Sequence, residues 1–113
     1  IAKDLLEFKK SIKKEILEKL QEMNDFSLNV LDESCLALFK EDYYQAEKII
    51  KKIEQISKFE KKIKDASKSI KGDEEMYRVR RLAENIRRIS EYASDIAEIV
   101  LNMNIEKTLK KTE

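Results

Sequence analysis

The sequence predicts an all-α fold, an antiparallel up-down-up bundle of three long helices at about 3–40, 43–71 and 74–107. Hydrophobic residues make up 42% of the chain and charged residues another 42%, with one glycine and no proline, a composition that suits amphipathic helices and leaves few residues for turns. Apolar residues recur at spacings of three and four, which is the helical period. The pattern has only two short breaks, and such short connections place successive helices antiparallel. At 113 residues we expect one domain, 1–113.

The first helix is expected over 3–40, where no residue strongly disfavours a helix. Poor helix formers at 24–27 allow a kink there, and a continuous helix is favoured. Cys35 lies between small and apolar neighbours and is expected to be buried. As the only cysteine it cannot form an intrachain disulfide. The residues expected to form the buried face are Leu5, Phe8, Ile12, Ile16, Leu20, Met23, Val30, Cys35 and Leu38.

The second helix is expected over 43–71. Asp42 is its predicted N-cap, with Gln45 three residues later in a capping-box arrangement. Gly72 is predicted to be the C′ residue that ends the helix. The predicted buried face consists of Ala46, Ile49, Ile53, Ile56, Phe59, Ile63, Ala66 and Ile70.

The third helix has the strongest pattern, over 74–107. Asp73 is its predicted N-cap, and the residues from Thr108 onward are expected to fray. An a/d repeat of apolar residues runs through it for about three and a half heptads. Its members are Val79, Leu82, Ile86, Ile89, Ala93, Ile96, Val100 and Met103.

Acidic residues gather on the opposite side of this third helix. Glu91, Asp95 and Glu98 adjoin at helical spacing and are candidate ligands for a hard cation. One helix face supplies only part of a coordination shell, so other ligands would come from water, a second chain or the first helix. The candidates on the first helix are Glu22, Asp25 and Asp32. The alternative interpretation is a solvated face, in which the carboxylates form weak ion pairs with arginines one turn away.

All five arginines lie between residues 78 and 88. Guanidinium groups suit carboxylates and phosphates, so a partner or anion surface is one interpretation, and pairing with neighbouring glutamates is the alternative. The formal net charge of the chain is only +1. We therefore expect no direct nucleic-acid binding. The candidate surface residues are Arg80, Arg81, Arg87 and Arg88.

Several function classes are excluded or disfavoured by what the sequence lacks. With no histidine, a Cys–His catalytic pair and His-ligated zinc are excluded. There is no glycine-rich phosphate loop, and carboxylates on an exposed helix face have nothing to raise their pKa for acid catalysis. We therefore expect no enzymatic activity. No apolar run reaches the roughly 18 residues of a membrane span, and no signal peptide is present. A cytoplasmic protein without membrane insertion is expected.

The residues from Arg88 to Glu98, R-I-S-E-Y-A-S-D-I-A-E, resemble the signature motif of the PhoU family. Residues 20–23 and 37–42 resemble the opening helix of a PhoU repeat, and the order and lengths of the helices are similar over 20–103. The chain also departs from the family pattern. Arg87 stands where the first motif acid would be, Glu91 replaces an aspartate, and Tyr92 replaces a histidine. Asp95 replaces an asparagine, which creates a shifted Glu91/Asp95 pair.

The resemblance implies a regulator of phosphate uptake that acts on a transporter ATPase or another regulator. Several PhoU proteins bind metal through carboxylates, so iron, zinc, manganese, magnesium or calcium is implied as an uncertain cofactor. The bacterial proteins carry two three-helix repeats and this chain has one, so a homodimer is expected. The residues after Tyr92 look more like the archaeal regulators, in which the domain often follows an AbrB-like DNA-binding domain. Because the chain begins at Ile1 and not at Met, we expect it to be part of a longer protein.

The leading hypothesis is therefore a regulatory protein-interaction domain of phosphate homeostasis. The alternative is a structural dimerisation module for an upstream AbrB-like domain, and a lesser alternative is a metal-binding bundle.

Overall fold

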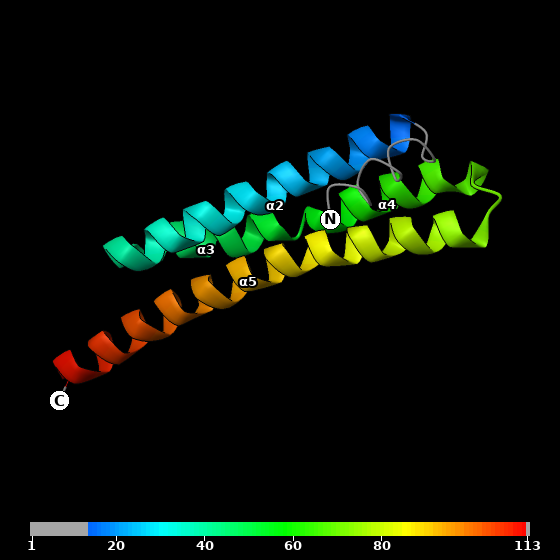
Figure 1. Cartoon of the computed structure of the whole chain (residues 1–113). Coiled ribbons are helices and arrows are strands. Elements are labelled where there is room, and N and C mark those ends of the chain that lie inside the picture. The colour runs from blue at the N-terminus through cyan, green and yellow to red at the C-terminus, as the bar shows by residue number, and fades with distance from the viewer. Residues whose placement is uncertain (1–13, 113) are drawn as a thin grey trace.

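The computed structural model describes residues 14–112, and it confirms the predicted all-α, up-down-up bundle. The helices are α2 (Lys14–Lys40), α3 (Tyr43–Ile53), α4 (Ile56–Ala66), a short 3-10 helix (Ser67–Ser69) and α5 (Asp73–Thr112). Helices α3 and α4 follow one another along the middle arm, so that α2 and α5 run in the same direction (Figure 1). The predicted segment 3–13, with Leu5, Phe8 and Ile12, lies outside the described residues.

The turn between α2 and α3 is confirmed at the predicted place and has a defined geometry. The Asp42 N–H donates to the Ala37 carbonyl at 2.8 Å, and the Glu41 N–H donates to the Leu38 carbonyl at 3.2 Å. These two bonds form a Schellman motif, with Glu41 in the left-handed region at φ 54°. The Asp42 side chain accepts from the Gln45 N–H at 3.1 Å, which confirms the predicted N-cap.

The middle arm differs from the predicted continuous helix. At Glu54 and Gln55 the backbone N–H groups donate to carbonyls three residues back, at 3.3 and 3.1 Å, which is the tighter 3-10 pattern. The cause is the spacing of Ile53, Ile56 and Phe59, which recur every three residues. An α-helix would rotate such residues away from the core, whereas a turn with three residues keeps them on one side.

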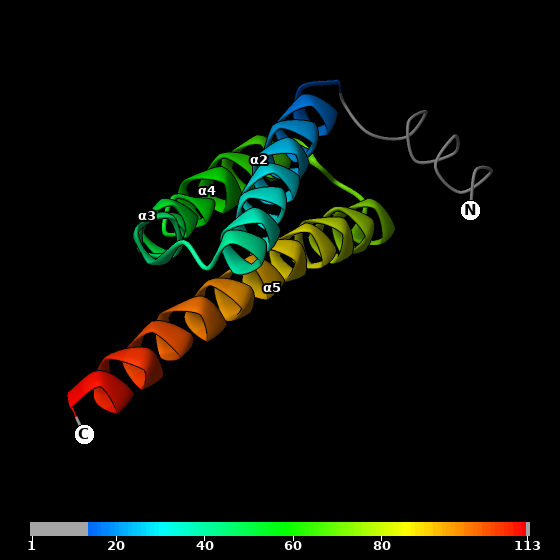
Figure 2. The same ribbon diagram turned by 90° about the vertical axis from the view of Figure 1, so that its left-hand side faces the viewer.

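The start and end of α5 also differ from the prediction. Gly72 does not have a positive φ, so its predicted role as a left-handed C′ residue is wrong. The Met76 N–H donates to the Gly72 carbonyl at 3.1 Å, which makes Gly72, and not Asp73, the residue that precedes the first helical turn. The helix continues to Thr112, so the fraying expected from Thr108 is not observed. Its last turns extend beyond the α2–α3 turn (Figure 2).

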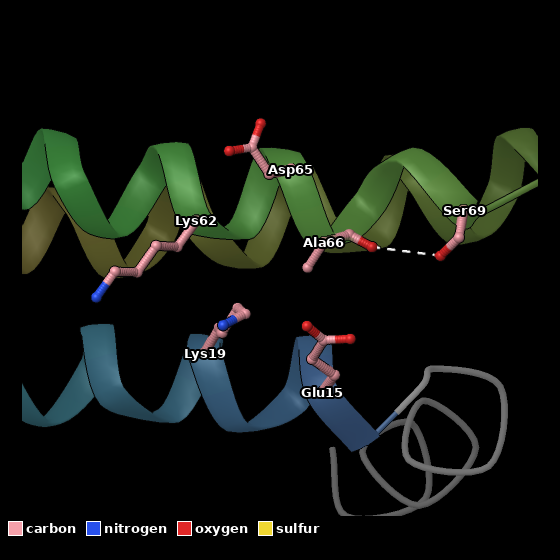
Figure 3. A pocket seen from close by; sticks show the side chains of 6 residues that line it. All are labelled: Glu15, Lys19, Lys62, Asp65, Ala66 and Ser69. Atoms are coloured by element: carbon pink, nitrogen blue, oxygen red, sulfur yellow. Dashed lines mark hydrogen bonds between the residues drawn. The ribbon is translucent and has the colours of Figure 1, made fainter.

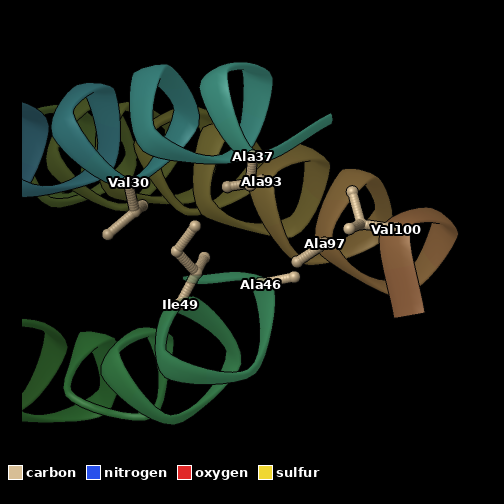
Figure 4. Packing of buried hydrophobic residues seen from close by; sticks show 7 residues of the cluster. All are labelled: Val30, Ala37, Ala46, Ile49, Ala93, Ala97 and Val100. Carbon is tan, nitrogen blue, oxygen red and sulfur yellow. The ribbon is translucent and has the colours of Figure 1, made fainter. Parts of the chain in front are cut away.

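The core consists of two clusters along the bundle. The cluster at the α4 end is made of large aliphatic residues and contains Ile16, Leu20, Met23, Ile63, Val79 and Ile86. The cluster at the α3 end is made mostly of small residues and contains Val30, Ala37, Ala46, Ile49, Ala93, Ala97 and Val100 (Figure 4). At this end the Ser34 hydroxyl donates to the Ala93 carbonyl at 2.9 Å, a bond that requires α2 and α5 to lie close together.

The buried stripe is shifted from the predicted one. On α5, Ser90 and Ala97 are buried although neither belongs to the predicted a/d repeat, while Ile89 and Ile96 are only half-buried. Cys35 is exposed, so its predicted burial is wrong. The reason is that α5 contacts both α2 and α3, and a helix between two neighbours buries a wider arc than a coiled-coil seam. The two buried positions outside the predicted repeat hold small residues, Ser90 and Ala97.

Candidate functional site on the outer face of α5

The structure places every predicted site residue on the exposed side of α5. Arg80, Arg81, Arg87, Arg88, Glu91, Asp95 and Glu98 are all exposed. They follow one another along the helix and do not surround a common cavity. The arrangement therefore offers a charged surface rather than an enclosed binding site.

The three candidate metal ligands do not form a cluster with other ligands. Among residues 14–112, no group of three or more His, Cys, Asp or Glu side chains is positioned to hold a metal ion. The proposed contributors on the first helix, Glu22, Asp25 and Asp32, are exposed and belong to no such group. Glu91 forms an ion pair with Arg87 at 3.3 Å, which favours the solvated-face interpretation. Over the described part of the chain, a metal at this face would have to take its remaining ligands from water or from a second copy.

The arginines divide into paired and unpaired groups. The Arg87 guanidinium lies 3.3 Å from Glu91 and 3.9 Å from Glu60, and Arg88 lies 4.0 Å from Glu84. These pairs are exposed and contribute a few tenths of a kcal/mol each. Arg80 and Arg81 form no ion pair with any described residue. Their donors are therefore available to an acidic partner or an anion.

The arginines border a shallow hollow that belongs to α5 alone. Its lining consists of Tyr77, Arg80, Arg81, Glu84, Asn85 and Arg88. These residues are three or four positions apart, so they share one side of the helix. A surface made by one rigid helix suits docking of another protein, because it has no walls that would enclose a small molecule.

A second hollow lies between α2 and the end of α4 (Figure 3). Glu15 and Lys19 line it from α2, and Lys62 and Asp65 line it from α4. Two positive and two negative side chains cancel each other, so the hollow has no net attraction for an ion. The lining of this hollow therefore does not indicate a ligand.

Comparison with known families gives the decisive observation. The PhoU domain family matches residues 20–100, which include most of α2, the whole middle arm and α5 as far as Val100. The chain belongs to the PhoU family. No curated protein and no solved structure matches it. The family assignment confirms the resemblance seen in the sequence.

The PhoU-like motif at 88–98 has two distinct sides in the structure. Ser90, Ala93 and Ala97 are buried and let α5 approach its neighbours closely. Arg88, Glu91, Asp95 and Glu98 are exposed. The motif therefore combines a packing function with a charged outer face. The signal that the a/d pattern missed is that Ser90 and Ala97 join Ala93 in a series of small buried residues on the side of α5 that packs against its neighbours.

Within the described residues, no helix is both long enough and apolar enough to cross a bilayer.

Proposed function

We propose that this chain is a non-catalytic, cytoplasmic protein-interaction domain that regulates phosphate transport or a phosphate-responsive pathway. The observation that carries the proposal is the match of residues 20–100 to the PhoU domain, whose family is regulatory and non-enzymatic. The exposed charged face of α5 supports a docking role.

The arginines of α5 are the proposed docking surface. Arg80 and Arg81 have no ion-pair partner among the described residues, and α5 is a continuous helix that holds them in fixed positions. Arginine forms two parallel hydrogen bonds with a carboxylate, so an acidic partner surface is the natural ligand. The proposed partner is the ATPase subunit of a phosphate transporter.

Binding to that subunit tests the proposal by titration calorimetry. The variant Arg80→Glu/Arg81→Glu reverses the two exposed charges that have no ion-pair partner among the described residues, and we expect it to weaken binding at least tenfold. The matched control is Lys61→Glu/Lys64→Glu, which changes the net charge equally on exposed positions of α4. Equal loss in both variants would indicate a net-charge effect only. Unchanged binding in the arginine variant would exclude this surface.

The dimerisation module is a second candidate because large apolar residues on α2 and α5 are exposed, including Leu28, Tyr92 and Ile99. In this case the chain would hold two upstream DNA-binding domains at the fixed spacing that paired half-sites need. Reporter repression with the whole protein would then depend on the apolar residues and not on Arg80 or Arg87.

The third candidate function is the metal-binding bundle. Because the described residues of one chain form no ligand cluster, we propose that a metal held by Glu91 and Asp95 would take its other ligands from water or from a second copy. Metal analysis of the purified protein tests this, with Glu91→Ala/Asp95→Ala as the variant. Metal content that is equal in both proteins would exclude Glu91 and Asp95 as ligands.

A further inference from the structure

The middle arm, residues 43–72, has a large excess of positive charge. It contains nine lysines, four acidic residues and no arginine, a net charge of +5, although the net charge of the whole chain is only +1. Helix α2, in contrast, has three lysines and six acidic residues, a net charge of −3. The charge of the molecule is therefore distributed very unevenly between neighbouring helices.

Most lysines of the middle arm form one stripe along it, which we call the lysine stripe. Positions 48, 51, 55, 58, 61, 64, 68 and 71 are three or four residues apart, which is the helical period. Gln55 occupies the one position of this series that has no lysine. The members of the lysine stripe are all exposed, and they are Lys48, Lys51, Lys58, Lys61, Lys64, Lys68 and Lys71.

The lysine stripe faces away from the rest of the bundle. Lys51 follows Ile49, which is 0% exposed, by two positions, and two positions are about 200° around a helix. Lys61 likewise follows Phe59, whose ring lies 5.1 Å from that of Phe26 in α2. The middle arm forms one edge of the bundle (Figure 2). No described helix therefore covers the lysine stripe.

The other two lysines of the arm lie on its side toward α2 and do not belong to the stripe. Lys52 pairs with Glu33 of α2 at 3.1 Å. Lys62 lines the hollow between α2 and the end of α4 (Figure 3). These contacts show which side of the arm faces α2, and the stripe lies on the outer side.

Few carboxylates neutralise the lysine stripe. Among residues 14–112, one member of the stripe forms an ion pair, Lys68 with Asp65 at 3.5 Å. The other three acidic residues of the middle arm form no ion pair with the stripe. One of them, Glu60, lies 3.9 Å from Arg87 and is turned toward α5. Most ammonium groups of the stripe are therefore available to an anionic partner.

We propose that the lysine stripe binds the surface of an anionic membrane, with the middle arm lying flat on the lipid headgroups. Clusters of four to eight basic residues on a helix are typical of segments that bind anionic lipids. From Lys48 to Lys71 the stripe is about 35 Å long at 1.5 Å per residue. Since α3 and α4 follow one another along the arm (Figure 1), its lysines reach a plane together. The apolar side of the arm is in the core, so the binding is electrostatic and involves no insertion.

The side chains of the stripe favour a lipid surface over a nucleic acid. Arginine, whose planar fork binds individual phosphates and guanine bases, is absent from the middle arm. The lysine ammonium is a compact, hydrated charge that suits a diffuse anionic surface. The stripe also contains no aromatic side chain on which a base could stack.

The acidic residues of α2 also favour a flat partner. Four of them are exposed on the side of α2 opposite its buried residues, namely Glu18, Glu22, Asp25 and Asp32. Because α2 and α4 occupy different corners of the bundle (Figure 2), these carboxylates point away from a plane that lies under the middle arm. A polyanion that wrapped around the molecule would be repelled by them.

Vesicle co-sedimentation with the unmodified protein is the first test. We expect binding to phosphatidylcholine vesicles that contain phosphatidylglycerol, and binding at least about tenfold weaker to phosphatidylcholine alone. Raising the salt concentration from about 0.1 M to about 1 M shortens the screening length from about 10 Å to about 3 Å and should release the protein. The proposal is overturned by absence of binding to the anionic vesicles, by equal binding to both kinds, or by binding that persists at high salt.

Removal of two lysines tests the stripe itself. A lysine near an anionic surface changes the affinity about fivefold, so Lys61→Gln/Lys64→Gln should weaken binding about 25-fold. The matched control is Lys40→Gln/Lys110→Gln, which removes two exposed lysines outside the stripe and should change the affinity far less. Circular dichroism verifies that both variants keep the helical content. Equal weakening in both variants would show an effect of net charge only and overturn the proposal.

An environment-sensitive fluorophore tests the orientation. In a Cys35→Ser background, Gln55→Cys places the label within the stripe and Asn29→Cys places it on the outer side of α2, both at exposed positions. On anionic vesicles we expect a blue shift of the emission from the label at 55 and none from the label at 29. Equal shifts, or a shift at 29 alone, would refute the orientation.

A short labelled DNA duplex separates the two kinds of polyanion. In fluorescence anisotropy under the same buffer conditions, we expect weaker binding to the duplex than to the anionic vesicles. Tighter binding to the duplex, lost in Lys61→Gln/Lys64→Gln, would assign the stripe to nucleic acid and overturn the lipid proposal. Neither assay contains a transporter subunit, so these outcomes are independent of the docking proposed for Arg80 and Arg81.

Discussion

Replacing Ser27 with alanine should stabilise the protein, although Ser27 lies at the centre of α2. The side chain is 0% exposed, and its hydroxyl oxygen has no hydrogen-bond partner among residues 14–112. Ser34, seven residues later on the same buried side, is also 0% exposed. Its hydroxyl, in contrast, donates to the Ala93 carbonyl at 2.9 Å. The two serines therefore form a matched pair that differs in hydrogen bonding.

The expected magnitudes follow from this difference. A buried polar group without a partner costs about 1–3 kcal/mol, and alanine is the better helix former by about 0.5 kcal/mol. Loss of packing around the removed oxygen offsets part of this gain, so Ser27→Ala should raise the free energy of unfolding by about 1 kcal/mol. Ser34→Ala removes the bond from its hydroxyl to the Ala93 carbonyl, a loss of about 1 kcal/mol, and gains the same helix propensity of about 0.5 kcal/mol. It should therefore lower that free energy by about 0.5 kcal/mol.

Urea unfolding followed by circular dichroism at 222 nm measures both changes. For a chain of this length, 1 kcal/mol corresponds to a shift in Tm of about 4 °C, so thermal unfolding gives an independent check. The reasoning is refuted if Ser27→Ala destabilises the protein as much as Ser34→Ala does. That result would mean that the Ser27 hydroxyl has a partner in solution, such as a carbonyl in the preceding turn.

Three further substitutions test individual parts of the fold by the same assay. Glu41→Gly removes a left-handed non-glycine residue, a gain of about 1 kcal/mol, but also removes the ion pair with Lys107, worth about 0.5 kcal/mol. We expect net stabilisation, and a net loss would show that the ion pair dominates. Ala93 is 0% exposed and its carbonyl accepts from Ser34 of α2, so Ala93→Leu inserts a large side chain into a filled contact and should cost about 3 kcal/mol; a neutral result would contradict the close packing. Phe26→Ala removes the ring that lies 5.1 Å from Phe59 and should cost about 2–3 kcal/mol. A change below 1 kcal/mol would mean that this ring pair contributes little.

The sequence was sufficient to predict the helix order and the first turn. The apolar spacing and the scarcity of glycine and proline indicate long helices without any knowledge of contacts, and Asp42 with Gln45 is a local capping signal. These features depend on residues close together in the sequence. The local pattern also allowed the helix to continue through 24–27, where Phe26 packs against α4 and supports it.

Other features depend on contacts that the sequence does not show. The break at Glu54 and Gln55 keeps Ile53, Ile56 and Phe59 on one side of the middle arm, where they face the same neighbouring helices. The left-handed residue at the first turn is Glu41 and not a glycine, because the Schellman bonds and the cap at Asp42 hold it in place. The candidate site was predicted as a set of exposed charges, but only side-chain positions distinguish the paired Arg87 from the unpaired Arg80 and Arg81.

The exposure of Cys35 and the partial exposure of Ile89 and Ile96 have one cause. A strict a/d pattern assigns Cys35, Ile89 and Ile96 to the core because they are apolar and correctly spaced. The bundle instead buries Ser34, Ser90 and Ala97, whose small side chains allow a close approach of α2 and α5. Close packing by small residues rotates the larger ones outward onto the adjoining flank. A sequence that places serine and alanine at the contact between α2 and α5 therefore leaves large apolar residues, such as Leu28, Tyr92 and Ile99, exposed at the surface of the same two helices.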